Sequence, residues 1–391
     1  MRSSSMPEST STSAAARKPL SEVLPPLVLG TATFNNQYNP DAHALPTNAI
    51  IHKAIQAGVR AFDTSPYYGP SEVLLGKALQ SQTFVPRSEY IIQTKCGRIA
   101  AQEFDYSPAS IRKSIQRSLQ RLRTDYLDVV FCHDVEFVSP EEVLSAVKTL
   151  RELRNQGVIR YVGISGYPVH VLATLAQQIK DTSGEPVDII MSYGHYTLQN
   201  TALYSKALHK IVEVGVECIL NASPLGMGLL RSQGVPTGSM GDWHPAPDGL
   251  RSRCLEASKV VEEYGERKQK LEHLALRFSI EGWMKDGAVA GTKVKPLVVS
   301  SDSGASLRAV NVSGPKLGIN VAGVSSTHEL DELMALWRDI VKAREREFLY
   351  QKVIDTFDGE WKDYSWASPG EGFVNRHKPE QSDDALVKSW L

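Results

Sequence analysis

The sequence predicts an α/β protein with the architecture of a (β/α)8 TIM barrel. Three observations predict it: β-rich apolar runs alternate with amphipathic segments, eight such runs occur, and polar residues recur where the runs end. The runs span residues 27–34, 59–65, 90–95, 126–134, 159–165, 187–193, 216–223 and 319–326. Near-continuous apolar strands separated by helices indicate parallel strands covered on both faces, in either a closed barrel or a doubly wound sheet. Because no G-x-G-x-x-G follows the first run, the closed barrel is favoured.

Helix start signals lie between the runs. Ser139, followed by a proline and by Glu142 at the third helical position, has the pattern of a capping box, and helical spacing then continues to Gly157. Ser107, also followed by proline, opens another helix, and a further one begins at Thr47. These segments predict the helices that connect successive strands.

Polar side chains stand at or just beyond the ends of the runs. They are Asp63, Lys95, His133, Asp134, Ser165, His195, Ser223, Ser325 and Ser326. In a barrel of this type the active site collects at the C-terminal ends of the strands. We therefore expect these side chains to surround one site.

We expect a single barrel domain over residues 25–349. Residues 1–24 are rich in Ser, Thr and Ala without an apolar core, which predicts a disordered tail, with a mitochondrial presequence as the alternative. Residues 285–318 have no clear period and are expected to form a disordered, atypical insertion. Residues 350–391 are expected to form a C-terminal extension that packs on the barrel, or else to meet a partner subunit.

The bulk properties narrow the classes of partner. A formal net charge of -1 and a pI of about 6.8 give no basic surplus, which argues against nucleic acid. No stretch approaches the ~20 apolar residues needed to span a bilayer, so no membrane association is expected. The four cysteines form no CxxC pair and favour a reducing, cytoplasmic location. We expect a monomer or weak homo-oligomer.

The motifs at the strand ends resemble one family. Residues 63–72, DTSPYYGPSE, resemble the aldo-keto reductase signature D-[TS]-[AS]-x-x-Y-G-x-x-E. Residues 93–95 (QTK), 132–134 (CHD), 163–165 (GIS), 223–230 (SPLGMGLL) and 323–326 (GVSS) extend the match. Residues 192–197 (SYGHYT) and 221–228 (NASPLGMG) most resemble the branch of D-arabinose and L-galactose dehydrogenases.

The resemblance implies a catalytic tetrad of Asp63, Tyr68, Lys95 and His133, and acid-base chemistry supports the same residues. Adding hydride to a carbonyl builds an alkoxide that needs a proton, and a phenol with a pKa near 10 is a poor acid-base group at neutral pH. We expect the ammonium of Lys95 to lower the pKa of Tyr68. Asp63 would hold Lys95 charged, and His133 would donate a hydrogen bond to the substrate oxygen.

The resemblance also implies a nicotinamide cofactor. The predicted cofactor-binding residues are Ser165, Ser192, Ser223, Leu225, Gly228, Ser325, Ser326, Glu329 and Glu332. Two positions depart from the family pattern, since Gly166 stands where Asn is usual and Ala222 where an aromatic ring often stacks on nicotinamide. The sixth-strand contact falls on Ser192 or Met191. Because Glu329 places a carboxylate where NADP-preferring members carry Lys or Arg, NAD is predicted to be preferred, with NADP possible.

The expected reaction is oxidation of the anomeric carbon of an aldose of the D-arabinose, L-galactose or L-fucose class to the lactone. Tyr67, His195 and Tyr196 are the predicted substrate contacts, because they combine flat apolar faces with polar groups. One alternative is a general aldehyde or ketone reductase. Another, of a different class, is a non-catalytic, cofactor-sensing regulatory subunit. No metal is expected, since no second ligand stands at metal-binding spacing from His133.

Overall fold

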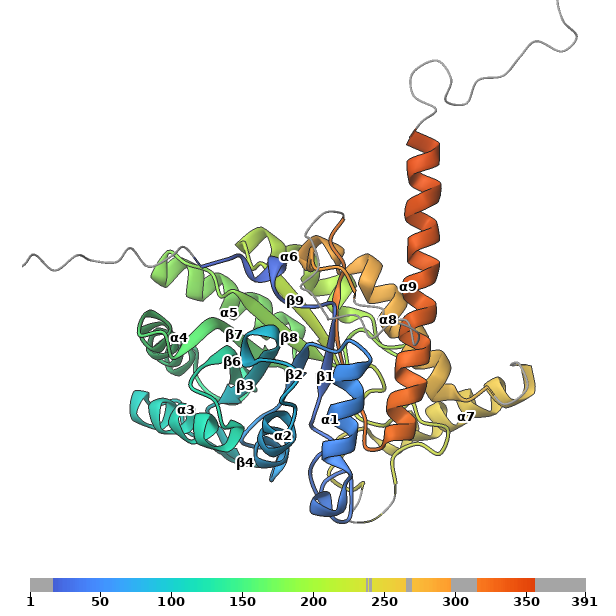
Figure 1. Cartoon of the computed structure of the whole chain (residues 1–391), viewed down its shortest axis with the longest axis horizontal. Coiled ribbons are helices and arrows are strands. Elements are labelled where there is room, and N and C mark those ends of the chain that lie inside the picture. The colour runs from blue at the N-terminus through green and yellow to red at the C-terminus, as the bar shows by residue number, and fades with distance from the viewer. Residues whose placement is uncertain (1–16, 237, 239–240, 265–268, 297–314, 356–391) are drawn as a thin grey trace, which may run out of the picture. The chain divides into compact units, whose positions relative to one another are not determined.

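A computed structural model describes residues 17–236, 238, 241–264, 269–296 and 315–355. Within them, parallel strands close a barrel in the order β1-β10-β9-β8-β7-β6-β3-β2 (Figure 1). The barrel strands are β1 (Leu27–Gly30), β2 (Ala61–Asp63), β3 (Ile91–Cys96), β6 (Leu127–His133), β7 (Ile159–Gly166), β8 (Ile189–Tyr193), β9 (Cys218–Ala222) and β10 (Ile319–Gly323). Six of them lie within predicted runs, and β3 and β7 extend one residue beyond theirs, so the predicted (β/α)8 barrel is confirmed.

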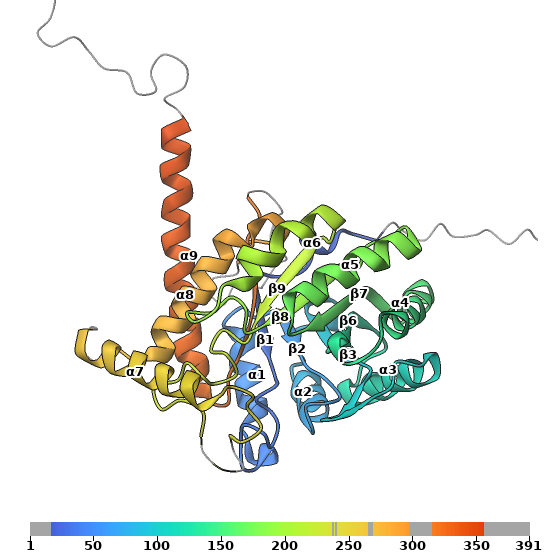
Figure 2. The same cartoon turned by 180° about the vertical axis from the view of Figure 1, so that it is seen from behind.

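Helices surround the barrel on its outside, as the views from the front and from behind both show (Figures 1 and 2). They are α1 (Thr47–Gln56), α2 (Ser71–Gln80), α3 (Pro108–Leu122), α4 (Pro140–Asn155), α5 (Val169–Ser183), α6 (Leu208–Val214), α7 (Asp248–Tyr264), α8 (Leu271–Asp286) and the part of α9 (Thr327–Asp355) up to Ile340. Shorter turns are η1 (Leu20–Glu22), η2 (Ala42–Ala44), η3 (Arg87–Glu89), η4 (Val135–Phe137), η5 (Leu203–Ala207) and η7 (Ala288–Ala290). A small antiparallel hairpin, β4 (Arg98–Ala100) with β5 (Glu103–Phe104), follows β3.

The helix starts follow the predicted capping chemistry. At α4, Ser139 Oγ accepts from the backbone N–H of Glu142, whose carboxylate accepts from the N–H of Ser139, so the capping box is present. At α3, Ser107 Oγ accepts from the N–H of Ser110 behind a proline at the first helical position. These caps fix where each helix begins after its strand.

The N-terminal ends of the strands are sealed by residues that precede β1. Leu20 and Leu24 are fully buried in the same apolar cluster as Ile189, Cys218 and Ile319, the first residues of β8, β9 and β10. The backbone N–H groups of Leu20 and Ser21 donate to Glu217, at 2.9 Å each. Arg17 binds Asp188 through both carboxylate oxygens. Residues 17–24 are therefore ordered, which corrects the predicted disorder for that part of the tail, while residues 1–16 lie outside the described residues.

The expected insertion at 285–318 is ordered where the structure describes it. Helix α8 continues to Asp286, η7 follows, and Thr292 forms an antiparallel bridge with Leu317. The backbone N–H of Lys293 also donates to Ser21 O at 2.7 Å. Residues 285–296 and 315–318 thus correct the expected disorder, and residues 297–314 lie outside the described residues.

The chain divides into two units, residues 1–340 and 341–391. The barrel belongs to the first unit. The second unit begins within α9, which extends helical structure to Asp355. Residues 356–391 lie outside the described residues, so the packing of the extension at 350–391 stays a prediction.

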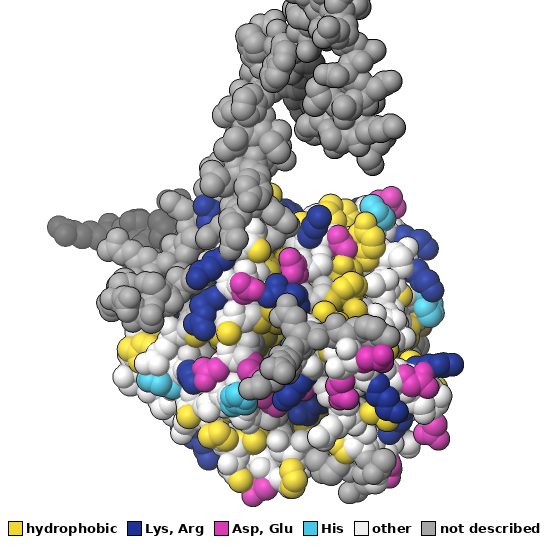
Figure 3. Space-filling view, turned by 90° about the vertical axis from the view of Figure 1, so that its right-hand side faces the viewer, with side chains coloured by type: hydrophobic (Ala, Val, Ile, Leu, Met, Phe, Trp, Pro, Cys, Tyr) yellow, Lys and Arg dark blue, Asp and Glu magenta, His cyan; other side chains and the backbone are white. Residues whose placement is uncertain are grey.

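Basic and acidic side chains are interspersed on the face shown in Figure 3. Cys96, Cys132, Cys218 and Cys254 are all buried free thiols, as expected for small apolar side chains. None of the helices in the described ranges is long and apolar enough to cross a bilayer.

Candidate active site

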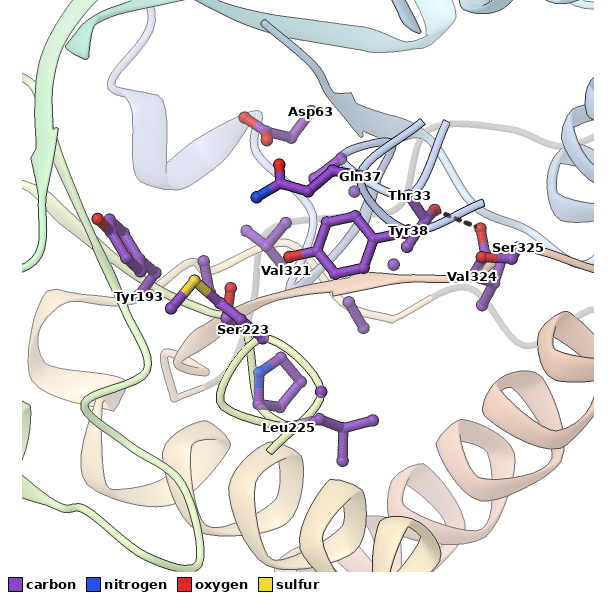
Figure 4. A pocket seen from close by; sticks show the side chains of 18 of the residues that line it. Thr33, Gln37, Tyr38, Asp63, Tyr193, Ser223, Leu225, Val321, Val324 and Ser325 are labelled. Atoms are coloured by element: carbon purple, nitrogen blue, oxygen red, sulfur yellow. Dashed lines mark hydrogen bonds between the residues drawn. The ribbon is translucent and has the colours of Figure 1, made fainter. Parts of the chain in front are cut away.

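A cavity of about 1050 Å³ opens at the C-terminal ends of the barrel strands. Every barrel strand contributes a residue at or near its end. These residues are Gly30, Asp63, Lys95, His133, Ser165, Tyr193, Ala222 and Gly323. Much of the remaining wall comes from the loops after β1, β9 and β10, from the segments after β2 and β3, and from α8. Figure 4 shows Tyr193 and Ser223 on one side with Thr33 and Ser325 on the other. The site lies where the fold predicts it.

Asp63 and Lys95 form a buried ion pair in the floor of the cavity. Lys95 Nζ lies 2.7 Å from Asp63 Oδ2 and also donates to the carbonyl oxygen of Thr64 at 3.0 Å. Both side chains are at most 5% exposed. Burial raises the pKa of Asp63, and the ammonium of Lys95 opposes that rise. The pair is held by neighbouring strands, since β2 and β3 are in register at this level.

Tyr68 stands over this pair. Lys95 Nζ lies 4.8 Å from the centroid of the Tyr68 ring, and the ring packs edge-on against His133 at 5.8 Å. Gly69, with φ of +56°, allows the chain to turn immediately after Tyr68. Ser71 then anchors the turn, since its Oγ donates to Thr31 O at the end of β1. The turn in the signature thus aims Tyr68 into the cavity.

The expectation that Lys95 lowers the pKa of Tyr68 is contradicted by the direction of the shift. Burial raises the pKa of Tyr68 well above 10, and the negative charges of Asp63 and Asp134 raise it further, whereas Arg98 lowers it. Burial is the main cause, and the carboxylate of Asp63, 2.7 Å from the ammonium of Lys95, offsets the effect of that ammonium on the phenol. Tyr68 is therefore a neutral phenol at neutral pH, ready to donate a proton.

His133 is neutral as well. Burial lowers its pKa to about 3, with Asp134 opposing the shift and Lys95 adding to it. Its Nδ1 lies 3.2 Å from Ser65 Oγ, which itself accepts from the backbone N–H of Tyr67. The hydroxyl hydrogen of Ser65 is then available to Nδ1, which places the ring hydrogen of His133 on Nε2. In this tautomer Nε2 is a hydrogen-bond donor.

Most of the predicted cofactor residues line the cavity. They are Ser165, Ser223, Leu225, Gly228, Ser325, Glu329 and Glu332. Positive φ values at Ser223 (55°) and Met227 (57°), both unusual for residues other than glycine, curl the loop after β9 along this wall. Ser326 does not line the cavity, because its Oγ caps α9 by accepting from the N–H of Glu329.

The orientation of side chains along β8 distinguishes Ser192 from Met191, the two candidates for a cofactor contact on the sixth strand. Ser192 is fully buried with its Oγ 3.5 Å from His195 Nδ1, whereas Met191 and Tyr193 line the cavity. Side chains alternate along a strand, so only one of two neighbouring residues can face the cavity. Ser192 therefore does not face the cavity, which corrects its predicted place there, and Met191 is the candidate that lines it.

Both departures from the family pattern have a structural counterpart. A Cβ at Gly166 would meet Glu136 Oε2 at 2.4 Å, so Glu136 occupies the space that a larger residue would need. Ala222 leaves room in the cavity wall, and Tyr193 is its direct partner on the neighbouring strand. Tyr193 thus supplies an aromatic ring beside Ala222.

Two of the three predicted substrate contacts turn away from the cavity. His195 and Tyr196 are not among its lining residues. The Tyr196 hydroxyl donates to Asp286 at 2.5 Å and its ring packs on Trp283, while His195 Nδ1 lies 3.1 Å from the carbonyl oxygen of Tyr193. The cause is the turn at Gly194, with φ of +70°, which redirects the chain after β8. Tyr67 does line the cavity.

Sequence reasoning missed several lining residues that come from loops. Arg98 reaches the cavity from the hairpin after β3, and Tyr38 and Trp243 meet edge-on at 5.1 Å from the loops after β1 and β9. These residues follow no strand-end pattern that would have revealed them. Within the described ranges, no group of three or more His, Cys, Asp or Glu side chains is arranged to hold a metal ion.

Comparison with known proteins agrees with this geometry. A model of the aldo/keto reductase family matches residues 26–345. A D-arabinose 1-dehydrogenase of Saccharomyces cerevisiae is 42% identical over 267 residues, covering 68% of this chain and 77% of the yeast protein. An L-galactose dehydrogenase of Arabidopsis thaliana is 40% identical over 236 residues, covering 59% of this chain and 69% of the plant protein.

The fold has a counterpart among solved structures. A crystal structure of an aldo-keto reductase homologue from Pseudomonas aeruginosa superposes with a TM-score of 0.50 at 21% identity, covering 81% of this chain and 90% of that one. With the family match over most of the chain and the tetrad gathered at the mouth of the barrel, the resemblance seen in the motifs is confirmed. The chain belongs to the aldo/keto reductase family and is an oxidoreductase of that family.

Proposed function

We propose that the protein is an NAD-dependent aldose 1-dehydrogenase that oxidises the anomeric carbon of an aldose to the lactone. The observation that carries this is the buried Asp63–Lys95 pair beneath Tyr68, with the donor nitrogen of His133 beside the phenol. The names of the two similar dehydrogenases, which act on D-arabinose and L-galactose, support aldoses as the substrate class.

The chain's own residues handle one proton and one developing charge. In reduction, Tyr68 donates its phenolic proton to the carbonyl oxygen, and the Nε2–H of His133 stabilises the growing negative charge on that oxygen. In oxidation, Tyr68 as phenolate accepts the proton of the anomeric hydroxyl. The ammonium of Lys95 is held beneath the ring by Asp63 and the Thr64 carbonyl. It offsets part of the charge of the phenolate.

The lining residues fit a nicotinamide dinucleotide. The cavity lies at the upper end of the ~300–1,000 Å³ range of small-molecule sites, which suits a large cofactor together with a small substrate. Ser165 would face the carboxamide, the loop from Ser223 to Gly228 the pyrophosphate, and Ser325 with Glu329 the adenosine. When bound in oxidised form, the cofactor supplies the hydride acceptor and a positive charge that favours the phenolate of Tyr68.

The preference for NAD rests on Glu329 and Glu332, which line the cavity together with Ser325, where the adenosine would lie. Arg231, whose Nη2 lies 3.7 Å from Glu329 Oε1, offsets only part of the acidic charge there. Glu329 is fixed there because its Oε2 accepts from the N–H of Ser325 at 2.7 Å. A fixed carboxylate repels a 2′-phosphate and can accept a hydrogen bond from a ribose hydroxyl.

Two other functions are separated from this one by the same assay. A general carbonyl reductase would turn over simple aldehydes as efficiently as aldoses, and a non-catalytic regulatory subunit would bind cofactor without turnover. The complete tetrad around one cavity favours an enzyme over the regulatory subunit.

The test is to incubate the full chain with NAD and D-arabinose, L-galactose, L-fucose or a simple aldehyde, and to follow absorbance of the reduced cofactor. We expect lactone formation from at least one aldose, and loss of at least about a hundredfold in kcat with Tyr68→Phe. Turnover of aldehydes alone would favour the carbonyl reductase. Cofactor binding without turnover of any carbonyl or aldose would favour the regulatory subunit.

A further inference from the structure

Asp134 is a buried carboxylate with one oxygen left open beside the proposed proton donor. It follows His133 directly, is 1% exposed and lines the cavity. Its Oδ2 accepts from Arg98 Nη1 and lies 3.5 Å from His133 Nε2. Its Oδ1 has no hydrogen-bond partner among the described residues. Leaving a charged oxygen buried and unpaired is costly, so Oδ1 is poised to accept a donor that enters with a ligand.

The carboxylate is held rigidly in this position. Asp134 adopts a left-handed backbone conformation, with φ of +57°, which is unusual outside glycine and persists where the surroundings enforce it. Arg98 supplies the opposite charge. Its guanidinium carbon lies 3.9 Å from the Tyr67 ring centroid and 5.4 Å from that of Phe104, so the arginine is itself fixed between aromatic rings.

Tyr67 adds a donor next to this acceptor. Its hydroxyl oxygen accepts from Arg98 Nη2 at 3.1 Å, so the hydroxyl hydrogen is available to the cavity. Asp134 and Tyr67 therefore present one acceptor and one donor beside His133. A hydroxyl group can satisfy both, because it both donates and accepts.

We propose that Asp134 and Tyr67 form a subsite for the hydroxyl group on the carbon next to the reacting carbon. This inference deepens the proposed oxidoreductase function and rests on it. His133 Nε2 faces the oxygen on the reacting carbon, and Asp134 is covalently its neighbour. An oxygen on the adjacent carbon lies within hydrogen-bonding distance of the reacting oxygen, and the carboxylate of Asp134, with its Oδ2 3.5 Å from His133 Nε2, is the neighbouring acceptor that it would meet. The site thus selects 2-hydroxylated substrates over plain aldehydes.

The selectivity for a 2-hydroxyl group comes from Asp134 Oδ1, which is buried and has no hydrogen-bond partner among the described residues. A site built to hydrogen-bond a substrate hydroxyl rejects an analogue that lacks it, since the buried polar group is then left unpaired. A hydrogen bond to a charged group corresponds to a discrimination of roughly tenfold to a hundredfold.

The experiment compares reduction of D-glyceraldehyde, which carries a hydroxyl next to its aldehyde, with reduction of propanal, which does not. The readout is the ratio of the two kcat/KM values in the wild type, in Asp134→Asn and in Glu136→Gln. Asp134→Asn keeps the shape but can turn its amide N–H2 toward the substrate in place of the acceptor oxygen. Glu136 is the matched control, because its Oε2 is also buried and unpaired among the described residues but does not line the cavity.

We expect the wild type to favour glyceraldehyde by about tenfold or more, and Asp134→Asn to lose more kcat/KM on glyceraldehyde than on propanal, chiefly through KM, so that most of the preference disappears. Glu136→Gln should keep the wild-type ratio. Equal losses on both substrates in Asp134→Asn would overturn the proposal, as would a wild type without preference. The wild-type ratio alone is decisive should the variant fail to fold. Because neither substrate is an aldose that cyclises, failure of aldose oxidation leaves this comparison intact.

Discussion

Tyr193 and Ala222 are direct neighbours across β8 and β9, and both line the cavity. The small side chain of Ala222 leaves room in the cavity wall, and Tyr193 lies beside it. Its own ring is supported by Tyr167 at 5.4 Å. The aromatic surface in this part of the cavity wall therefore comes from β8 and not from β9.

If Tyr193 covers the nicotinamide, its removal weakens cofactor binding. An aromatic stacking contact contributes about 0.5–1.5 kcal/mol, so we expect Tyr193→Ala to raise the Kd for NAD by up to about tenfold, while Tyr193→Phe stays near the wild type. Titration of the protein's intrinsic fluorescence with NAD measures both. Equal affinities in Tyr193→Ala and the wild type would place the ring elsewhere.

The high pKa of Tyr68 predicts different pH profiles for the two directions. Oxidation needs the phenolate, and because burial raises this pKa well above 10, kcat/KM for aldose oxidation should rise about tenfold per pH unit between pH 6 and 9. Reduction needs the phenol and should be flat over that range. His133, with its pKa lowered to about 3, should add no inflection near pH 6.5. A plateau of oxidation below pH 8 would show that bound cofactor lowers the pKa of Tyr68 more than burial raises it.

The buried Asp63–Lys95 pair predicts a separation of stability from activity. Asp63→Asn leaves the ammonium of Lys95 without a counter-charge and should lower the free energy of unfolding by about 3–5 kcal/mol. The double variant Asp63→Asn with Lys95→Met removes both charges and should recover much of that loss, yet remain inactive. Urea denaturation and steady-state kinetics on the same preparations check the two parts. A double variant as unstable as the single one would mean that shape, rather than charge, sets the stability.

The carboxylate of Glu329 predicts the cofactor preference. Glu329→Gln keeps an oxygen to accept from the N–H of Ser325 but loses the negative charge, so it should raise kcat/KM for NADP relative to NAD by roughly fivefold to tenfold. The wild type should favour NAD. Glu281, which lies on α8 outside the cavity lining, provides the control as Glu281→Gln. A wild type that strongly prefers NADP would reject the assignment, whatever the variant does.

The barrel and the tetrad were predictable because both follow from regular features of a chain. Eight apolar runs with helix caps between them define the strands, and the C-terminal ends of those strands meet, so Asp63, Lys95 and His133 had to converge. Tyr68 was predictable from its place in the signature.

The predictions that were wrong concern residues whose orientation or pKa depends on local geometry. Choosing Met191 over Ser192 requires the phase of β8, which a one-residue shift reverses. The turn at Gly194 sends His195 and Tyr196 away from the cavity, although their residue types suit a sugar. The pKa of Tyr68 depends on how completely Asp63 neutralises Lys95 and on burial, neither of which a list of residue types contains.

The residues before β1 close the lower end of the barrel, with Leu20 and Leu24 in its core and Glu217 holding the backbone at Leu20 and Ser21. The match to the family begins only at residue 26. A recombinant fragment that begins at that boundary would therefore lack the segment that covers this end of the barrel. Water would reach the first residues of β8, β9 and β10, and Glu217 would be left without its backbone donors. A fragment made for crystallisation should therefore begin before Arg17, because the hydrogen bonds of Arg17 to Asp188 help to hold this segment against the barrel.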